Sequence, residues 1–231
     1  IVEAAVDAGF RAAGANGPGF PTMVGSGTNA CTLHYVENRD TIDDEALVLI
    51  DAGAEVAMYN GDITRTYPAA GGFSDTQRDV YRIVEAARRA AVEKVSPGVT
   101  IASVHEAAAR TILEGLVGLG VLSGPMEELF SEAAYRLFFP HQTSHWLGLD
   151  VHDPGDYAKA GESRVLEPGM VFTIEPGLYF RPEACEDAAA RFSGIGVRIE
   201  DDVLVTDDGC EVLTAALPTG ESEVEDLVGA R

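Results

Sequence analysis

Apolar residues recur every three or four positions between residues 73 and 95, which is the period of one face of an α-helix. Ser74 and Gln77 have the spacing of a capping box at the start of this stretch. Pro97 and Gly98 follow its end, where helices usually stop. The pattern predicts a long amphipathic helix that buries one face.

Three other stretches have helical character. They are residues 1–14, 101–119 and 125–135. The chain begins without Met inside the first pattern, and no basic stretch followed by an apolar core opens it. We therefore expect no signal peptide. We also expect that this is part of a longer protein, with an N-terminal domain preceding a truncated first helix.

Strand-like runs lie on both sides of the central helices. A short strand is expected at 22–24, and the runs at 45–56 and 58–71 are expected to pair as an antiparallel ribbon. Further runs with strand character are 141–153, 169–180, 194–206 and 210–218. This order predicts an α+β domain in which helices cover one face of a curved sheet.

Length and composition narrow the class of protein. The 231 residues, 46% hydrophobic and 23% charged, can form one large domain with a substantial core. No run of about 18 uncharged apolar residues occurs, so we expect no membrane span. The formal net charge of −22 disfavours nucleic acid and anionic membranes, because both need clustered Lys and Arg.

Cysteine usage indicates a reducing compartment. Cys31, Cys185 and Cys210 are odd in number, far apart and in no Cys-X-X-Cys pair. This pattern is unlike a disulfide framework or a thiolate metal site. We therefore expect a cytoplasmic protein.

Four carboxylates interrupt apolar, strand-like runs: Asp51, Asp62, Glu175 and Glu200. A buried carboxylate is costly unless it is paired or bound to a cation. A ribbon with a short turn would bring the two aspartates side by side, and two such charges repel each other unless a divalent cation lies between them.

Histidines are concentrated in one segment. Three of the five in the chain, His141, His145 and His152, lie in HQTSHWLGLDVHD. Together with the strand carboxylates they form an oxygen-and-nitrogen ligand set without sulfur. Other polar residues are expected in solvent: Asp201 and Asp202 after the last strand carboxylate, and His105 on the surface of a helix.

Five stretches resemble a known family. LVLIDAG, GDITRTYP, HQTSHWLGLDVHD, EPGMVFTIEPGLY and GIGVRIEDDVLVT have the order and spacing of the metallopeptidases with the pita-bread fold. The resemblance reaches to about Pro218 and is greatest to bacterial Xaa-Pro aminopeptidases (aminopeptidase P). It implies a curved, mainly antiparallel sheet covered by helices, in two pseudo-symmetric halves, with residues 1–231 as the catalytic domain. An Ala-rich helical motif shared by 1–14 and 103–116 fits two related halves.

The resemblance implies a site for two divalent metal ions. The matching ligands are Asp51, Asp62, His145, Glu175 and Glu200, of which Asp62 and Glu200 are expected to bridge both ions. Two ions about 3.5–4 Å apart activate a bridging water near neutral pH and polarise the scissile carbonyl. Such ligands suit Mn²⁺, Co²⁺ or Zn²⁺, and the resemblance favours Mn²⁺.

Other residues acquire expected roles from the same resemblance. His34, His141 and His152 match histidines that line the substrate cleft, and Glu175 matches the group that passes a proton to the leaving amine. Tyr179 and Arg198 are expected to support the ligands. Arg198 stands two positions before Glu200, so both side chains point to the same strand face. Trp146 is expected to pack behind its strand, and Gln142 stands where the family usually has Gly.

The implied activity is removal of the N-terminal residue from peptides whose second residue is proline. Hydroxide held between the metals would attack the carbonyl before the proline. Two alternatives remain open. One is a prolidase, which shares the ligands and cleaves only dipeptides, and the other is a non-catalytic binding protein on the same fold. The expected partners are proline-containing peptides, and the resemblance allows a homo-oligomer.

Overall fold

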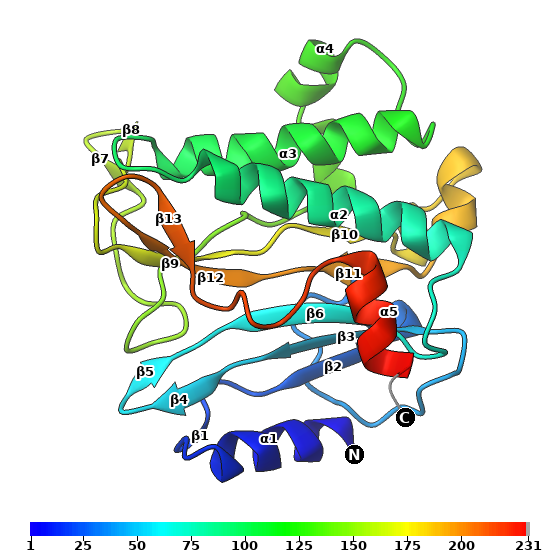
Figure 1. The fold of residues 1–231 in the computed structure, drawn as a ribbon. Coiled ribbons are helices and arrows are strands. Elements are labelled where there is room, and N and C mark those ends of the chain that lie inside the picture. The colour runs from blue at the N-terminus through cyan, green and yellow to red at the C-terminus, as the bar shows by residue number, and fades with distance from the viewer. Residues whose placement is uncertain (230–231) are drawn as a thin grey trace.

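Two antiparallel three-stranded sheets form the centre of the fold in the computed structural model, which describes residues 1–229. The sheets have the strand orders β2-β3-β6 and β13-β12-β9. Figure 1 shows α1 below the first sheet, with α2 and α3 above the second. The main elements are α1 Val2–Ala12, β2 Met23–Ser26, β3 Leu47–Ala52, β6 Ile63–Pro68, α2 Asp75–Lys94, α3 Ile101–Gly118, β9 Val171–Ile174, β12 Asp201–Val205 and β13 Cys210–Val212. The α+β prediction is confirmed.

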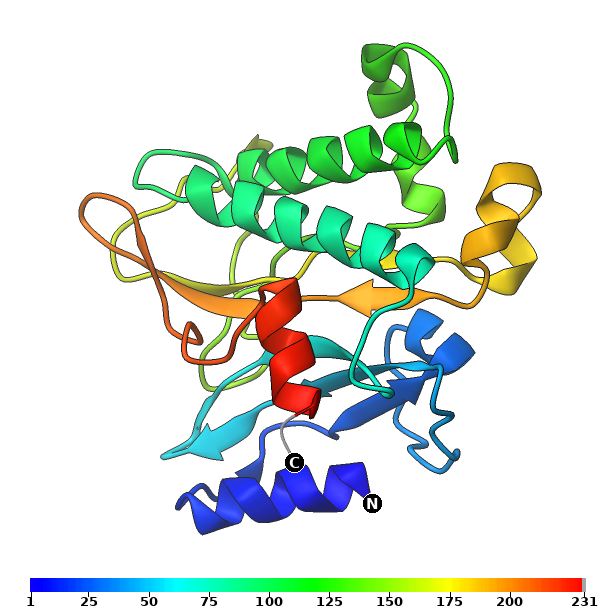
Figure 2. The ribbon, with the colours of Figure 1, turned by 45° about the vertical axis from the view of Figure 1, so that its right-hand side comes forward.

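Shorter elements connect and extend these sheets. The remaining strands and helices are β1 Gly17–Pro18, β4 Ala54–Val56, β5 Tyr59–Asn60, α4 Met126–Ser131, β7 Ala158–Lys159, β8 Glu162–Ser163, β10 Gly177–Tyr179, β11 Gly196–Arg198 and α5 Glu221–Gly229. The 3₁₀ turns are Gly27–Cys31, Ala134–Leu137, Pro182–Ala184 and Asp187–Phe192. Figure 2 shows α5 in front of the two sheets, where it contacts β6 and α2.

The helix predicted from the capping box is α2. Both hydrogen bonds of the box between Ser74 and Gln77 are present. The apolar faces of α2 and α3 pack against each other, and α2 packs against β9, β10 and β11, so that side chains such as Val84 and Leu113 are completely buried. This layer closes one side of the core. Of the helices that the structure describes, none combines the length and apolar character needed to span a bilayer.

The helix predicted at 125–135 is shorter than expected. α4 ends at Ser131, and Ala133 takes a left-handed conformation with φ of 52° before the turn Ala134–Leu137 begins. That turn buries Tyr135. Burial of the Tyr135 ring against the core outweighs the local helical preference of the sequence. No glycine in this segment indicates the end of the helix.

The predicted ribbon is the pair β3 and β6. Asp51 lies opposite Thr64 in its register, and Asp62 precedes the first paired residue of β6. The β4–β5 hairpin joins the two strands, and the chain is close-packed where it enters and leaves this hairpin, because a Cβ atom at Gly53 would lie 1.6 Å from the carbonyl oxygen of Gly61. Only glycine allows this approach, which brings the two aspartates to the same end of the ribbon.

Gly53→Ala is therefore expected to force the ribbon apart and to lower the free energy of unfolding by about 1–3 kcal/mol, the usual cost of overpacking. Urea titration followed by circular dichroism measures this loss. Gly209→Ala is the matched control, because nothing lies within 4 Å of a Cβ atom there. Equal stability of the two variants would contradict the close approach at Gly53.

Candidate metal centre

Two breaks in a long antiparallel pair of strands place the glutamates. β9 and β10 are separated by Glu175 and Pro176, and β11 and β12 are separated by Ile199 and Glu200. The register is the same on both sides of the gap, since Ile174 pairs with Asp201 and Gly177 pairs with Arg198. Glu175 and Glu200 therefore stand opposite each other where the ladder is interrupted.

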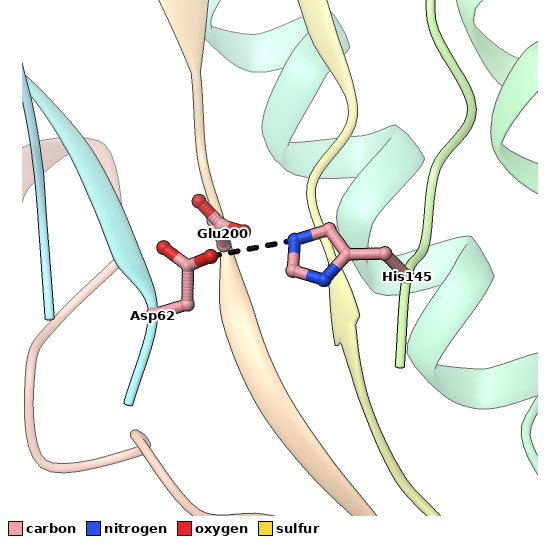
Figure 3. A group of neighbouring side chains, drawn as sticks. All are labelled: Asp62, His145 and Glu200. Atoms are coloured by element: carbon pink, nitrogen blue, oxygen red, sulfur yellow. Dashed lines mark ion pairs between the residues drawn. The ribbon is translucent and has the colours of Figure 1, made fainter. Parts of the chain in front are cut away.

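Three ligand-type side chains converge from separate elements. Asp62, His145 and Glu200 each offer one ligand atom, and these atoms lie within 4.8 Å of one another. Figure 3 shows Asp62 beside β6, Glu200 on the β11–β12 strand and His145 on the loop that faces them. Nε2 of His145 lies 3.3 Å from Oδ2 of Asp62 and 3.5 Å from Oε1 of Glu175. The structure thus brings these predicted ligands together.

The ring of His145 presents an unprotonated nitrogen to these carboxylates. Its Nδ1 lies 3.1 Å from the carbonyl oxygen of Trp146 and donates to it, because a carbonyl can only accept. In the neutral ring Nε2 is then a lone-pair acceptor that faces carboxylate oxygens. Burial lowers the pKa of His145 to about 4, so the ring is neutral near pH 7.

Arg198 ties the fourth carboxylate, Asp51, to the cluster. Its Nη2 donates to Oδ2 of Asp51 at 2.5 Å, and its Nε donates to Oγ1 of Thr64 at 3.0 Å. Thr64 in turn donates to Oε2 of Glu200 at 2.5 Å. Arg198 is 4% exposed, so this buried guanidinium orients two expected ligands from one position.

The same guanidinium begins a chain that reaches His141. Nη1 of Arg198 donates to the hydroxyl of Tyr179 at 3.1 Å, and this hydroxyl lies 2.9 Å from Nε2 of His141. The hydroxyl proton therefore points at Nε2, and Nδ1 of His141 carries the ring proton and donates to the carbonyl of Gln142 at 2.8 Å. Burial lowers the pKa of His141 to about 3, with Arg198 adding to the effect.

Too few protein groups neutralise the carboxylates. Oδ1 of Asp51 and Oδ1 of Asp62 are buried and have no hydrogen-bond partner among the residues that the structure describes. Burial and the neighbouring acidic groups raise the pKa of Asp62 to about 10 and that of Glu200 well above its ordinary value. Burial also raises the pKa of Glu175 to about 8, with Arg198 opposing and Asp51 adding to the shift.

Three features favour a bound cation: carboxylate oxygens without hydrogen-bond partners, several acidic groups close together, and the lone pair of His145 Nε2 directed at them. The oxygen-rich donor set with one nitrogen and no sulfur fits divalent ions such as Mn²⁺, Co²⁺ or Zn²⁺. These residues therefore fit the metal centre predicted from the motifs.

The cluster lies in a cavity of about 820 Å³. His34, His141 and His152 line it together with all five expected ligands. The ring centroids of His145 and His152 are 4.4 Å apart. Apolar side chains complete the wall: Phe20, Met23, Leu33, Val36, Ile101 and Val151. Trp146 is 9% exposed and stacks on Tyr157, so it packs in the core as expected.

Three expectations about exposed residues are wrong. Asp201 and Asp202 are 1% and 5% exposed. Asp201 pairs with two arginines from distant parts of the chain, and burial raises the pKa of Asp202 to about 7. His105 lies in the cavity wall, where Nδ1 accepts from the backbone N–H of Thr143 at 3.2 Å. The residues next to Asp201, Asp202 and His105 in the sequence give no indication of these distant partners.

Comparison with known proteins identifies the class of this fold and site. Residues 1–207 match metallopeptidase family M24. The chain belongs to this family, which confirms the resemblance seen in the motifs.

The similar proteins are aminopeptidases. The chain is 48% identical over 221 residues to the Xaa-Pro aminopeptidase of Escherichia coli K12, covering 96% of this chain and 49% of that protein. It is 47% identical to the Xaa-Pro aminopeptidase of Haemophilus influenzae, covering 91% and 48%. A solved aminopeptidase of Pseudomonas aeruginosa has a TM-score of 0.95 at 48% identity, covering 99% of this chain and 52% of that one. The chain thus spans about half the length of these relatives.

The raised pKa values of the acidic groups predict that the metal-free chain loses stability as pH rises. Asp62 and Glu175 have folded pKa values of about 10 and 8, above the ordinary values near 4, so the folded state holds more protons. The histidines with lowered pKa act in the opposite direction, because the unfolded chain protonates them more readily, but this effect is confined to pH values below about 6.5. Between pH 6.5 and 8, stability should fall by up to about 1.4 kcal/mol per pH unit for each extra proton.

Urea unfolding in the presence of a chelator measures this slope. Added Mn²⁺ should stabilise the chain more at pH 8 than at pH 6.5, because metal binding replaces the bound protons. Glu175→Gln should reduce the slope in the metal-free chain. Stability that stays level or rises over this range would show that the carboxylates are not protonated in the folded state.

Proposed function

We propose that this chain carries the catalytic site of an aminopeptidase that releases the N-terminal residue from peptides with proline in second position. The observation that carries the proposal is the convergence of Asp62, His145 and Glu200 within 4.8 Å in the cavity. The names of the similar proteins supply the substrate class, because they are Xaa-Pro aminopeptidases.

The site would hold two divalent ions, with Mn²⁺ as the first choice. Asp51, Asp62, His145, Glu175 and Glu200 would be the ligands, with Asp62 and Glu200 shared between the ions. When bound, the ions supply an activated hydroxide near neutral pH and a Lewis acid for the carbonyl before the proline. The buried oxygens of Asp51 and Asp62 that lack partners support this assignment.

Glu175 is suited to proton transfer. It is only half-buried, it faces the cavity, and its Oε2 lies 3.6 Å from Nδ1 of His141. In this role it takes a proton from the attacking water and gives it to the leaving amine of proline. Burial raises the pKa of Glu175 to about 8 in the metal-free chain, which supports a carboxyl that can hold a proton.

The cavity histidines would orient the peptide. His34 and His152 lie with ring centroids 6.4 Å apart, and His152 adjoins the ligand His145. His141 is held in one tautomer, with Nε2 facing the hydroxyl of Tyr179 and its N–H directed at the carbonyl of Gln142, so it would shape the cleft wall. The ring N–H of His34 or His152 could donate to a peptide carbonyl.

Replacement of either expected bridging ligand should abolish activity. Asp62→Ala and Glu200→Ala are expected to lower metal affinity and kcat/KM by more than the about 10–100-fold that changes around a metal ligand cost. Metal content after dialysis and hydrolysis of a proline peptide measure both effects. Glu114→Gln, on the exposed face of α3, is the control. Retained activity in Asp62→Ala or Glu200→Ala would show that the ligand assignment is wrong.

Peptide length separates the aminopeptidase from the prolidase alternative. We expect Xaa-Pro-Yaa-Zaa to be cleaved between Xaa and Pro with a kcat/KM at least about tenfold above that of the dipeptide Xaa-Pro. Mass spectrometry of the products, with both peptides at equal concentration, measures this. Cleavage of the dipeptide alone would favour prolidase. A folded chain that binds none of Mn²⁺, Co²⁺ and Zn²⁺ would favour a binding protein.

Two further parts of the proposal concern the setting of the enzyme. The three cysteines are free, in keeping with a reducing compartment, and we place the protein in the cytoplasm. An N-terminal domain outside this chain and a homo-oligomeric assembly remain predictions.

A further inference from the structure

Two buried acidic residues follow Glu200, and the proposed reaction uses neither. Asp201 and Asp202 open β12, with exposed fractions of 1% and 5%. Successive strand residues point to opposite faces of a sheet, so Asp202 shares the face of Glu200 and Asp201 faces the other way. Burying two adjacent carboxylates is costly, and each requires a specific interaction in return.

Asp202 reaches the backbone of an expected metal ligand. Its Oδ2 accepts the main-chain N–H of Asp62 at 3.1 Å, across 140 positions of sequence. Asp62 lies one residue before the first paired residue of β6, where the ladder with β3 has ended. Its amide therefore bonds a side-chain acceptor instead of a strand carbonyl.

The carboxylate of Asp202 is otherwise poorly satisfied. Its Oδ1 is buried and has no hydrogen-bond partner in the described part of the chain, and the backbone N–H of Asp202 donates to Oγ1 of Thr214 at 3.2 Å. If this side chain only filled space, an apolar side chain of similar size would be less destabilising, because it would leave no buried oxygen without a hydrogen bond. The contact with the Asp62 amide is what the carboxylate contributes.

Asp201 anchors the strand from the other face. Its Oδ1 lies 2.7 Å from Nη2 of Arg65, and its Oδ2 lies 2.8 Å from Nη1 of Arg88 on α2. Arg65 is 1% exposed and also donates to four main-chain carbonyls. These belong to Thr64, Glu200, Leu217 and Pro218. These contacts fix the first residues of strand β12 between β6, α2 and the segment before α5.

We propose that Asp202 is a positioning residue for the metal centre. Its carboxylate holds the backbone of Asp62 so that the Asp62 side chain stays aimed at His145 and Glu200. The ion pairs of Asp201 with Arg65 and Arg88 anchor the start of β12 from its opposite face. The consequence for metal binding rests on the proposed function, whereas the hold on Asp62 does not.

Asp202→Ala and Asp202→Asn test the role, because only the second keeps an oxygen that can accept the Asp62 amide. Calorimetric titration of the metal-free variants with MnCl₂ should show about 10–100-fold weaker binding for Asp202→Ala, and affinity within about threefold of wild type for Asp202→Asn. Tyr81→Phe is the matched control. It removes a buried hydrogen bond of 2.8 Å to the carbonyl of Thr219, away from the ligands, and should leave Mn²⁺ affinity unchanged.

Hydrogen exchange of the Asp62 amide, followed by NMR without metal, provides a second reading. Exchange should be at least about tenfold faster in Asp202→Ala than in wild type and Tyr81→Phe, because the amide loses its acceptor. Unchanged exchange, wild-type Mn²⁺ affinity in Asp202→Ala, or equally weak affinity in Asp202→Asn would overturn the proposal. The last result would assign the effect to charge alone. If wild type binds no Mn²⁺, Co²⁺ or Zn²⁺, the proposed function fails, and the amide exchange still decides whether Asp202 holds Asp62.

Discussion

Repulsion among buried carboxylates is the constraint on which the site depends. Asp51, Asp62 and Glu200 are each at most 6% exposed, and Glu175 stands opposite Glu200 at the gap in the sheet. Within residues 1–229, one buried guanidinium, that of Arg198, lies among them. A single cation cannot balance four acids, so the metal-free site relieves the repulsion by binding protons, and divalent cations relieve it better.

The fold meets this constraint by interrupting its own strands. Gly53 and Gly61 bring two ends of a ribbon into contact, and the gap beside Pro176 frees two glutamates from the ladder. Each interruption leaves a backbone group that a side chain then satisfies: the Glu200 carbonyl accepts from Arg65, and the Asp62 amide donates to Asp202. Positioning is therefore distributed over side chains that never face the cavity.

The sequence predicts most helices and strands and a set of residues that line one cavity, because both leave local marks, although the strand expected at 141–153 is a loop with one isolated bridge at Trp146. The capping box at Ser74 is one such mark, and a carboxylate inside an apolar strand is another. The sequence does not predict where Asp201 and Asp202 lie. Arg65 and Arg88, the ion-pair partners of Asp201, are 136 and 113 positions away in sequence. The neighbouring residues do not distinguish a paired acid from a solvated one. The position of His105 is not predicted for the same reason, since its hydrogen-bond partner Thr143 lies 38 positions further on.

The proposed metal centre is a pair of cations held by residues from both halves of the chain. Anomalous diffraction from crystals soaked in MnCl₂ tests this most directly. The account predicts two manganese peaks about 3.5–4 Å apart, both contacting Asp62 and Glu200, with His145, Asp51 and Glu175 completing the ligands. A well-ordered site without a peak, or peaks bound by other residues, would contradict it.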